Sequence, residues 1–307
     1  MKASKIQEKK ASLLEEKPKL SQREIAEQIG VPEGSLVASM VGEDTIRLNR
    51  HPEKVLPHLT NIADAMAVSR NRGVLLEHKH AYAPVRFFEG KAWMFKASTS
   101  LCFDLANWGE SFLVPANGKQ AASIQIFNGL GQAIHKCFFP DEYSPAIVKS
   151  ARHPKQKSDL SWEGGTDSAA VIPDEGALDS DRFSRMWNQL GDLYNLDRLQ
   201  AAFQLSRLQV LRQAGEDSAQ RLEKDALFET IRAAARSGTA IRVEVDTPGC
   251  RQSWIGVLPE PQSFGKWINL LNETFNLHID DSRVHQIWRA SLPLQPHPVT
   301  SMEVFDK

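Results

Sequence analysis

Cysteine is scarce in this chain, and its spacing excludes the common roles of the residue. The 307 residues include 3 cysteines, at positions 102, 137 and 250. An odd number at wide spacing forms neither a disulfide framework nor a paired-cysteine metal site. The sequence also has no HExxH motif, no Ser-His-Asp order, no P-loop and no Gly-x-Gly-x-x-Gly run. It therefore shows no signature of a metalloprotease, a triad hydrolase or a nucleotide-binding protein.

An excess of charge of one sign is absent as well. Lys and Arg number 37 and Asp and Glu 38, so the chain offers no strongly basic surface for nucleic acid. No apolar run approaches the length of a membrane span. The first twenty residues are charged throughout and have no apolar core of a signal peptide. These absences predict a cytoplasmic protein with enough chain for two ordinary domains.

The sequence contains one pattern twice. Residues 123–139 read SIQIFNGLGQAIHKCFF, two alternating apolar runs joined by Asn128-Gly129, which predicts a hairpin with a two-residue turn. SMEVFDK at 301–307 repeats the first arm of this hairpin. Each half also has a helix-like run before a strand, ADAMAVSRNRG before VLLEH and LFETIRAAARSG before TAIRVEV. We predict two related domains, the second without its last strand, so that strand 299–305 becomes a sheet edge.

The order of helical and strand-like runs predicts the fold class α+β, with each half a helical segment followed by a large antiparallel β-sheet. Helices are expected at 4–17, in two short pieces across 21–42, around 51–66 and throughout 182–236. Strands are expected from 73 to 139 and from 239 onward. The predicted boundaries are 1–145 for an N-terminal repeat, 146–181 for an exposed linker rich in Pro, Gly, Ser and charge, and 182–307 for a C-terminal repeat.

One segment has the pattern of a DNA-binding motif. REIAEQIGVPEGSLVASMVG resembles a helix-turn-helix, with Ser21 and Glu24 as a capping box for its first helix. Its second helix begins at Glu33 and offers no Arg or Lys to phosphates. A helical hairpin that packs on a sheet is the favoured alternative, and DNA is an unlikely partner.

Two sets of polar residues are candidates for ligand binding. His78 and His80 fall on one face at the end of a predicted strand, which suits a metal or a ligand, with a solvated strand end as the alternative. In the second half, cations lie among aromatic residues, which suits a flat apolar ligand that carries carboxylates. The alternative there is a core beside a solvated face. The residues are Arg207, Lys266, Arg283, Arg289, Trp254, Trp267, Trp288, Phe264 and Phe275.

Over both halves the chain resembles the bacterial hemin-degrading and heme-trafficking family of the HemS/HmuS type, known for a tandem α+β duplication. The stretches that carry the resemblance agree in order and spacing. They are REIAEQIGVPEGSLVASMVG, AVSRNRGVLLEHK, SIQIFNGLGQAIHKCFF, GCRQSWIG, GKWINLLNETFNLHI, SRVHQIW and VTSMEVFD. The resemblance implies heme as the cofactor, held in a cleft of the C-terminal half, and a place in iron acquisition through hemin transport.

The resemblance also implies an axial histidine in a Trp-containing helix, in a pattern like W-x-x-L-x-D-x-H. Here MWNQLGDLYNLDRLQ matches at Trp187, Leu190 and Asp192 but has Tyr194 at the ligand position. A tyrosine can bind ferric heme as phenolate, so Tyr194 is the candidate metal ligand. The alternative is a tyrosine on the helix surface and weak or lost heme binding.

Other positions implied by the resemblance are kept in part. Arg207 and Lys266 match two cations of the family, and Arg289 lies near a third position, which holds Ser291. The family's distal arginine falls on Cys102, which supplies neither the charge nor the hydrogen bond of an arginine.

A histidine that some relatives use for a second heme falls on Leu76, which leaves His78 as a stand-in. The resemblance thus implies a cofactor-binding set of Tyr194, Arg207, Lys266, Arg289, Cys102 and His78.

Three functions follow from the resemblance. The first is a cytoplasmic heme-binding protein for heme trafficking and utilisation, whose partners are a heme-uptake transporter or a heme-degrading enzyme. The second is an enzyme that cleaves the porphyrin oxidatively with an external reductant, against which Cys102 counts because catalysis needs a distal hydrogen-bond donor. The third is a divergent member that no longer binds heme and has an interaction or regulatory role.

Overall fold

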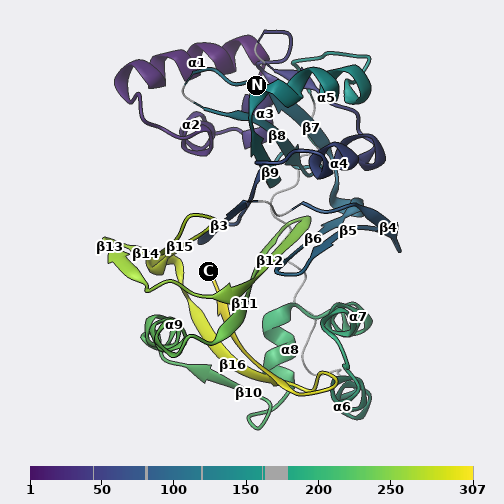
Figure 1. Ribbon diagram of the computed structural model, residues 1–307, viewed down its shortest axis with the longest axis vertical. Coiled ribbons are helices and arrows are strands. Elements are labelled where there is room, and N and C mark those ends of the chain that lie inside the picture. Colours follow the sequence, from purple (N-terminus) through teal and green to yellow (C-terminus); the bar gives the residue numbers. More distant parts are fainter. Residues whose placement is uncertain (44, 80–81, 119, 161, 163–178, 307) are drawn as a thin grey trace. The chain divides into compact units, whose positions relative to one another are not determined.

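The structure is a computed structural model that describes the chain except for residues 44, 80–81, 119, 161, 163–178 and 307. The chain divides into two compact units, Met1–Gly164 with Ala234–Ile279, and Gly165–Ala233 with Asp280–Lys307. Both units combine helices with antiparallel strands, which confirms the predicted α+β class (Figure 1). The first unit contains strands from both halves of the sequence, so the compact units follow a different division from the predicted repeats.

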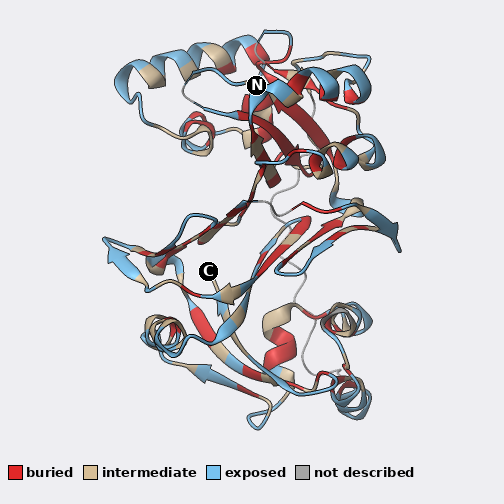
Figure 2. Ribbon diagram, in the orientation of Figure 1, coloured by how far each residue is buried: buried red, intermediate tan, exposed pale blue. Residues whose placement is uncertain are grey.

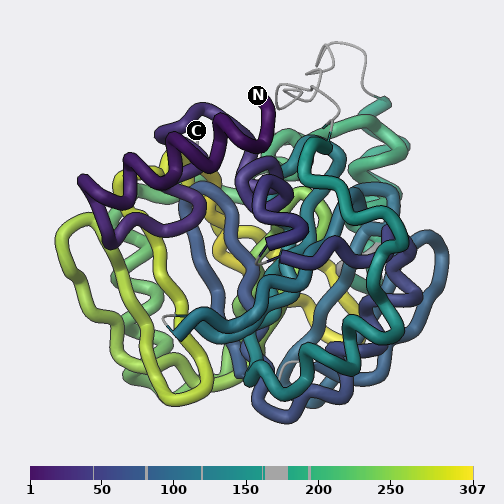
Figure 3. Tube along the Cα trace, turned by 90° about the horizontal axis from the view of Figure 1, so that it is seen from above, coloured from purple at the N-terminus to yellow at the C-terminus, as the bar shows by residue number. Residues whose placement is uncertain are grey.

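Helices at both ends of the first half belong to the first unit. They are α1 (Ala3–Glu16), α2 (Gln22–Ile29), α3 (Glu33–Ala38), α4 (Pro52–Thr60) and α5 (Ser144–Ala151). The predicted capping box begins α2, because the Ser21 side chain accepts from the Glu24 backbone and the Glu24 carboxylate accepts from the Ser21 backbone. Helix α2 ends at Gly30, whose φ of 78° suits glycine. Helix α1 packs along α2 and α3 (Figure 3).

Two antiparallel sheets make up the rest of the first unit. The nine-stranded sheet has the order β1 (Ile46–Arg47), β7 (Glu110–Val114), β8 (Ala122–Phe127), β9 (Ala133–Phe139), β2 (Met66–Arg70), β3 (Val74–Lys79), β15 (Phe275–Asp280), β14 (Trp267–Leu271) and β13 (Gln262–Phe264). The five-stranded sheet has the order β11 (Ala240–Thr247), β12 (Cys250–Val257), β6 (Thr99–Asp104), β5 (Lys91–Lys96) and β4 (Arg86–Phe88).

The two sequence halves exchange strands in these sheets. The hairpin β2–β3 of the first half pairs with β15 of the second, where Leu76 lies opposite Leu277. The hairpin β11–β12 of the second half pairs with β6 of the first, where Gln252 lies opposite Leu101. Each copy therefore completes its sheet with strands of the other copy. The sequence predicted the duplication but not this exchange.

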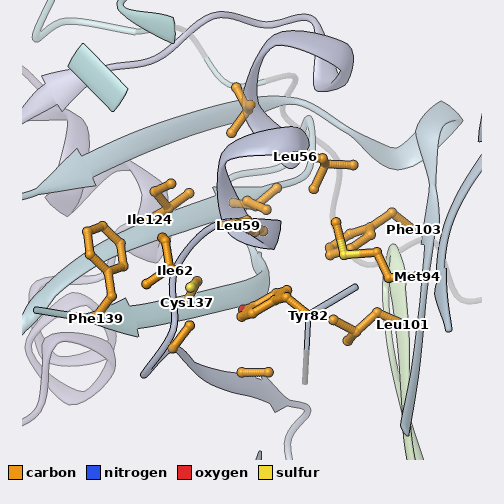
Figure 4. Packing of buried hydrophobic residues seen from close by; sticks show 14 of the residues in the cluster. Leu56, Leu59, Ile62, Tyr82, Met94, Leu101, Phe103, Ile124, Cys137 and Phe139 are labelled. Atoms are coloured by element: carbon orange, nitrogen blue, oxygen red, sulfur yellow. The ribbon is translucent and has the colours of Figure 1, made fainter. Parts of the chain in front are cut away.

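The main hydrophobic core of the first unit lies between helices and the inner faces of both sheets. In Figure 4, Leu59 of α4 lies near Ile124 and Cys137, and Leu56 lies toward Phe103 and Met94. Side chains of β5 and β6 close the same cluster; they are Ala92, Met94, Leu101 and Phe103. Buried residues accordingly concentrate on the strands (Figure 2).

The second unit is smaller. It contains α6 (Ser180–Asn188), α7 (Leu193–Phe203), α8 (Arg207–Gln213), most of α9 (Ala226–Ser237) and a three-stranded sheet in the order β10 (Ala219–Leu222), β16 (Gln286–Leu292) and β17 (Val299–Phe305). Its core joins the helices to one face of this sheet through Phe183, Trp187, Leu199, Ala290 and Leu292. Among the described strands β17 pairs on one side only, as predicted for residues 299–305. None of the described helices is long and apolar enough to cross a membrane.

Four local predictions were wrong. The helix-like run at 63–73 contains β2, since helix α4 already ends at Thr60. The hairpin at Asn128-Gly129 forms, but five residues separate β8 from β9, because the Asn128 side chain accepts from the backbones of Leu130 and Gln132 and stabilises a wider loop. Residues 146–151 are helical, with Ile147 buried, rather than exposed linker. Strand β10 interrupts the expected all-helical region.

Candidate functional site

The five-stranded sheet has one face in the core and one face with aromatic and charged side chains. Because side chains alternate along a strand, the buried Ala92 and Met94 leave positions 91, 93 and 95 of β5 on the other face. Cross-strand pairing adds residues of β4, β6, β11 and β12 to it, with charges of both signs. This surface is called the aromatic face here and comprises Arg86, Phe88, Lys91, Trp93, Phe95, Ser100, Cys102, Asp104, Arg242, Glu244, Asp246, Arg251, Ser253 and Ile255.

Stacked rings form the centre of the aromatic face. The rings of Trp93 and Phe95 lie 5.4 Å apart with an interplanar angle of 8°, and Lys91 Nζ lies 5.9 Å from the Trp93 ring centroid. Phe95 is 54% exposed and Ile255 43% exposed. Exposed apolar side chains that adjoin cations on a sheet face suit a flat apolar ligand with negative charge. The stacked rings and Lys91 of this face suit a porphyrin that carries carboxylates, whereas Arg251 is already bound by Asp246 and Glu244.

Cys102 lies on the aromatic face between two neighbours. It is buried in β6 and pairs with Trp93 of β5 and with Arg251 of β12. The Arg251 Nε atom lies 2.7 Å from Asp246 Oδ1 and 3.3 Å from Glu244 Oε1, both on β11. Burial raises the pKa of Glu244, while Arg251 and Arg242 act in the opposite direction. An arginine is thus fixed next to the position at which the resemblance expected one.

Arg207, in the second unit, already binds a carboxylate of the chain. Its Nε donates to Glu303 Oε2 at 2.6 Å, and its Nη2 donates to Glu303 Oε1, so the pair is bidentate. The side chains are 25% and 14% exposed. Ser301 Oγ also donates to Glu303 Oε1 at 3.0 Å, and Trp288 lies opposite Glu303 on the same sheet face. A ligand carboxylate would have to displace Glu303 to reach the Arg207 fork.

Arg289 belongs to a different surface of the second unit. Alternation along β16 places Arg289 and Ser291 on the face opposite to Trp288 and Glu303. Arg289 Nη2 donates to Gln220 Oε1 at 3.1 Å on that face. The structure therefore does not group Arg289 with Arg207 on one face of the sheet.

The single Trp-containing helix expected to hold the iron ligand is divided in the structure. Trp187 lies in α6, which ends at Asn188, and Tyr194 lies in the next helix, α7, because the chain turns at Gly191, whose φ is 62°. Trp187 and Leu190 are buried in the core of the second unit. The Asp192 carboxylate accepts from the Asn195 backbone at 2.9 Å, in the first turn of α7. Tyr194 lies in that turn, but its side chain is outside the described part of the structure. The role of Tyr194 as ligand stays a prediction.

The remaining sequence candidates lie apart in the first unit. His78 is 8% exposed and lies in β3 between Ala67 and Phe275, so the interpretation as a solvated strand end is wrong. His80, its expected companion, lies outside the described residues. In the described part of the chain, no group of three His, Cys, Asp or Glu residues is arranged to hold a metal ion. Lys266 is exposed, with Nζ 5.1 Å from the Trp267 ring centroid.

His278 fits the structural role predicted for it, since its Nδ1 lies 2.7 Å from Asn269 Oδ1 on the neighbouring strand β14. The helix-turn-helix pattern is a packed hairpin. Leu36, Val37 and Ala38 of α3 are buried, and Val37 and Ala38 pack against Phe112 and Phe127 of β7 and β8. A recognition helix needs an exposed face for the major groove, so the favoured alternative is confirmed.

A buried polar network lies in the first unit that the sequence did not indicate. His135 of β9 is 1% exposed, with Ser69 Oγ 3.0 Å from its Nδ1 and Tyr82 Oη 2.8 Å from its Nε2. Burial lowers the pKa of His135 to about 3 and raises the pKa of Cys137 to about 12. The imidazole is therefore neutral and this thiol protonated near pH 7, which suits a structural role better than catalysis.

Comparison with known proteins assigns the family. The Haemin-degrading HemS.ChuX domain matches residues 30–151 and 204–307, more than half of the chain. The chain belongs to the HemS/ChuX family. It is 25% identical over 293 residues to the hemin transport protein HmuS of Yersinia pestis, covering 92% of this chain and 83% of HmuS.

Solved structures support the same assignment. Apo-PhuS, a heme-binding protein from Pseudomonas aeruginosa, has a TM-score of 0.92 at 29% identity, covering 99% of this chain and 90% of that one. The heme degrading enzyme ChuS of Escherichia coli O157:H7 has a TM-score of 0.89 at 21% identity, covering 99% and 90%. The likeness to ChuS concerns the fold, and the duplicated architecture predicted from the sequence is confirmed.

The sequence carries one signal of the aromatic face but lacks the pairing that completes it. The alternation of Lys91, Trp93 and Phe95 was visible in KAWMFK, and it signals one shared face. The neighbour of that face, Arg251, lies 149 positions after Cys102, and only the exchange of strands between the halves joins them. No local pattern contains that pairing.

Proposed function

We propose that this protein binds heme and carries it after uptake, as a trafficking and utilisation protein of its family. The observation that carries the proposal is the combination of family membership with the aromatic face, where stacked Trp93 and Phe95 adjoin Lys91 and Arg251. The likeness to PhuS, named as a heme-binding protein, over 99% of this chain supports it. The cytoplasmic location and the delivering or receiving partner stay predictions from the sequence.

Specific roles follow for the chain's own residues. Trp93 and Phe95 would provide an apolar surface for the porphyrin plane, and cations would bind its carboxylates. The second unit, considered by itself, has two candidates that the resemblance implies. Tyr194 is its candidate iron ligand, since ferric heme accepts a phenolate, and Arg207 could bind a ligand carboxylate only by exchanging Glu303 for it. Arg289 and Lys266 would contribute less, because Arg289 is engaged with Gln220 and Lys266 is at an exposed turn beside Trp267.

A hemin titration tests the proposal. Purified protein at micromolar concentration should give a saturable Soret band, and absence of saturation would rule out heme binding. Tyr194→Phe should remove the high-spin ferric spectrum expected of a phenolate ligand, and Tyr194→His should give a spectrum typical of a histidine ligand.

Tyr143→Phe is the matched control for these variants, because Tyr143 belongs to the core of the first unit next to α5. Its spectrum should equal that of the wild type. If Tyr194→Phe keeps the wild-type spectrum while the protein still binds hemin, Tyr194 is not the ligand and heme binding itself stands.

Degradation of heme is the second candidate, favoured by the matching domain's description as haemin-degrading. Oxidative cleavage needs a hydrogen-bond donor near the iron, and Cys102 is a weak one. We expect heme-loaded protein with ascorbate and catalase to release no biliverdin-type product at a useful rate. A product spectrum of that type would establish the enzyme instead.

A further inference from the structure

A short segment after α5 contacts the first unit and lies outside both ranges of the matching family domain. That domain matches residues 30–151 and resumes at 204, whereas residues 152–160 and Trp162 are described beside the helices and strands of the first unit. These residues are called the strap here. The sequence predicted them as part of an exposed linker, so the contacts of the strap are a finding of the structure.

The beginning of the strap covers the outer edge of β1. Strand β1 is the last strand of the nine-stranded sheet and pairs with β7 alone. Away from β7, the Arg47 backbone N–H donates to Gln156 Oε1 at 2.9 Å, and Gln156 Nε2 donates to the Arg47 carbonyl at 2.9 Å. The His153 backbone N–H donates to the same carbonyl at 3.0 Å. A side-chain amide thus makes the two hydrogen bonds that a neighbouring strand would make, and the strap protects this sheet edge.

The middle of the strap caps the first helix. The backbone N–H of Ala3, the first residue of α1, donates to Asp159 Oδ1 at 2.6 Å. Lys2, at the N-cap position of α1, makes no side-chain cap hydrogen bond. A carboxylate at a helix N-terminus satisfies a free N–H and interacts favourably with the helix dipole. The strap therefore supplies the cap that the sequence of α1 lacks, and the two segments stabilise each other.

Trp162 ends the strap in a slot that two glycines leave open. Its ring centroid lies 6.2 Å from that of Phe127, at an interplanar angle of 67°. A Cβ atom on Gly34 would lie 2.7 Å from Trp162 Cη2, and one on Gly131 would lie 3.0 Å from Trp162 Cδ2. Contacts this short are repulsive, so the indole ring fits because neither position carries a side chain.

The docked state of Trp162 includes one unfavourable feature. Its Nε1 atom is buried and has no hydrogen-bond partner in the described part of the chain. A buried donor without a partner loses its hydrogen bonds to water, which offsets part of the gain from burying the ring. The rest of the strap is held by a few hydrogen bonds rather than by a ladder. A segment held in this way can open locally while the rest of the unit stays folded.

We propose that the strap is a latch that opens and closes on the first unit, and that Trp162 holds it closed. In the closed state the strap covers the edge of β1 and caps α1. In the open state α1 loses its cap, and the strap residues are added to the connection between the two units. This inference goes beyond the proposed function and does not depend on heme.

Limited trypsin digestion of the full-length apo protein measures opening of the latch. Residues 158–181 contain no Lys or Arg, so cleavage after Lys155 and Lys157 reports on the strap itself. Cleavage of a transiently opened segment follows the population of the open state. Trp162→Ala should speed cleavage at both sites by about tenfold, since it removes the main apolar contact of the strap. Cleavage after Lys96, in the turn between β5 and β6, is the internal reference and should keep the wild-type rate.

Trp108→Ala is the matched control. Trp108 is a second partly buried tryptophan of the first unit, its Nε1 atom is also buried without a partner, and its ring packs against Phe103 rather than the strap. This variant should lower the denaturant midpoint and leave cleavage after Lys155 unchanged relative to cleavage after Lys96.

Gly34→Ala tests the slot without altering Trp162. The added Cβ meets the indole ring, so this variant should also speed cleavage of the strap. Introduced into Trp162→Ala, it should add little, because both substitutions remove the same contact.

The possible results separate a latch from general unfolding. Faster cleavage after Lys155 in Trp162→Ala and Gly34→Ala, with cleavage after Lys96 unchanged, would support the latch. Unchanged cleavage of the strap in either variant would overturn it. Equal acceleration at Lys155 and Lys96, or the same acceleration at Lys155 in Trp108→Ala, would overturn it as well, because unfolding of the whole unit would then expose the strap. None of these results bears on hemin binding, so the proposed function is tested separately by the hemin titration.

Discussion

At the scale of single residues, His135 links stability to pH. Its pKa is lowered to about 3 by burial, whereas an unfolded histidine has a pKa of about 6.5. Between these values only the unfolded chain binds the proton, so stability falls as pH decreases below about 6.5, by about 1.4 kcal/mol per pH unit at most. Denaturant unfolding of wild type and His135→Gln between pH 4.5 and 7.5 should show a steeper loss for wild type. Parallel curves would mean that another group dominates.

Arg207 and Glu303 make a second prediction at this scale. Because Glu303 holds both donors of the Arg207 fork in the described structure, it competes with any ligand carboxylate. Arg207→Gln should therefore weaken hemin binding, whereas Glu303→Gln should strengthen it, each by about tenfold for about 1.4 kcal/mol.

Breaking this partly buried pair from either side also lowers apo stability, since a charge is left without its partner. Hemin affinities and denaturant midpoints of both variants separate the two effects. If both substitutions change hemin affinity in the same direction, the pair only fixes α8 to β17, and Arg207 has no part in the ligand site.

At the scale of elements, the helix-turn-helix pattern predicted the helical hairpin of α2 and α3, and α3 packs in a hydrophobic core. Leu36 is fully buried among Ile25, Ala26 and Ile29 of α2. Leu36→Ala should lower the free energy of unfolding by about 2–5 kcal/mol, the range for a truncated core leucine. Leu271→Ala, at a position 46% exposed, should cost much less. Denaturant melts give both values, and equal losses would contradict the packed-hairpin interpretation.

Most strands and helices followed from local pattern, and the errors have physical causes. The runs VLLEH, AWMFK and SIQIF became β3, β5 and β8 because alternation and branched residues act locally. Part of the run ADAMAVSRNRG became strand β2, because pairing of β2 with β3 and β9 outweighs the helix propensity of its Ala and Met residues.

The candidate site was less predictable than the elements. The sequence named Cys102 and Arg207 as candidate site residues but not their partners, since Arg251 and Glu303 lie 149 and 96 positions away. Contacts at such separation depend on topology, and the exchange of strands between the halves has no signature in either half alone.

At the scale of the whole molecule, the exchange of strands makes the halves depend on each other. In the nine-stranded sheet β3 pairs with β15, and in the five-stranded sheet β6 pairs with β12. A fragment of residues 1–162 would retain α4 and its core but leave β3 and β6 as new edges, with the apolar Leu76 and Leu101 beside missing partners. We expect this fragment to aggregate or to unfold without cooperativity. We expect the same of a fragment of residues 179–307. Co-expression of both fragments should restore a soluble complex, which size-exclusion chromatography would detect. Circular dichroism should then show a single unfolding transition for this complex. A monomeric 1–162 fragment that unfolds cooperatively would show that the first repeat folds by itself and that the exchange adds stability without being required.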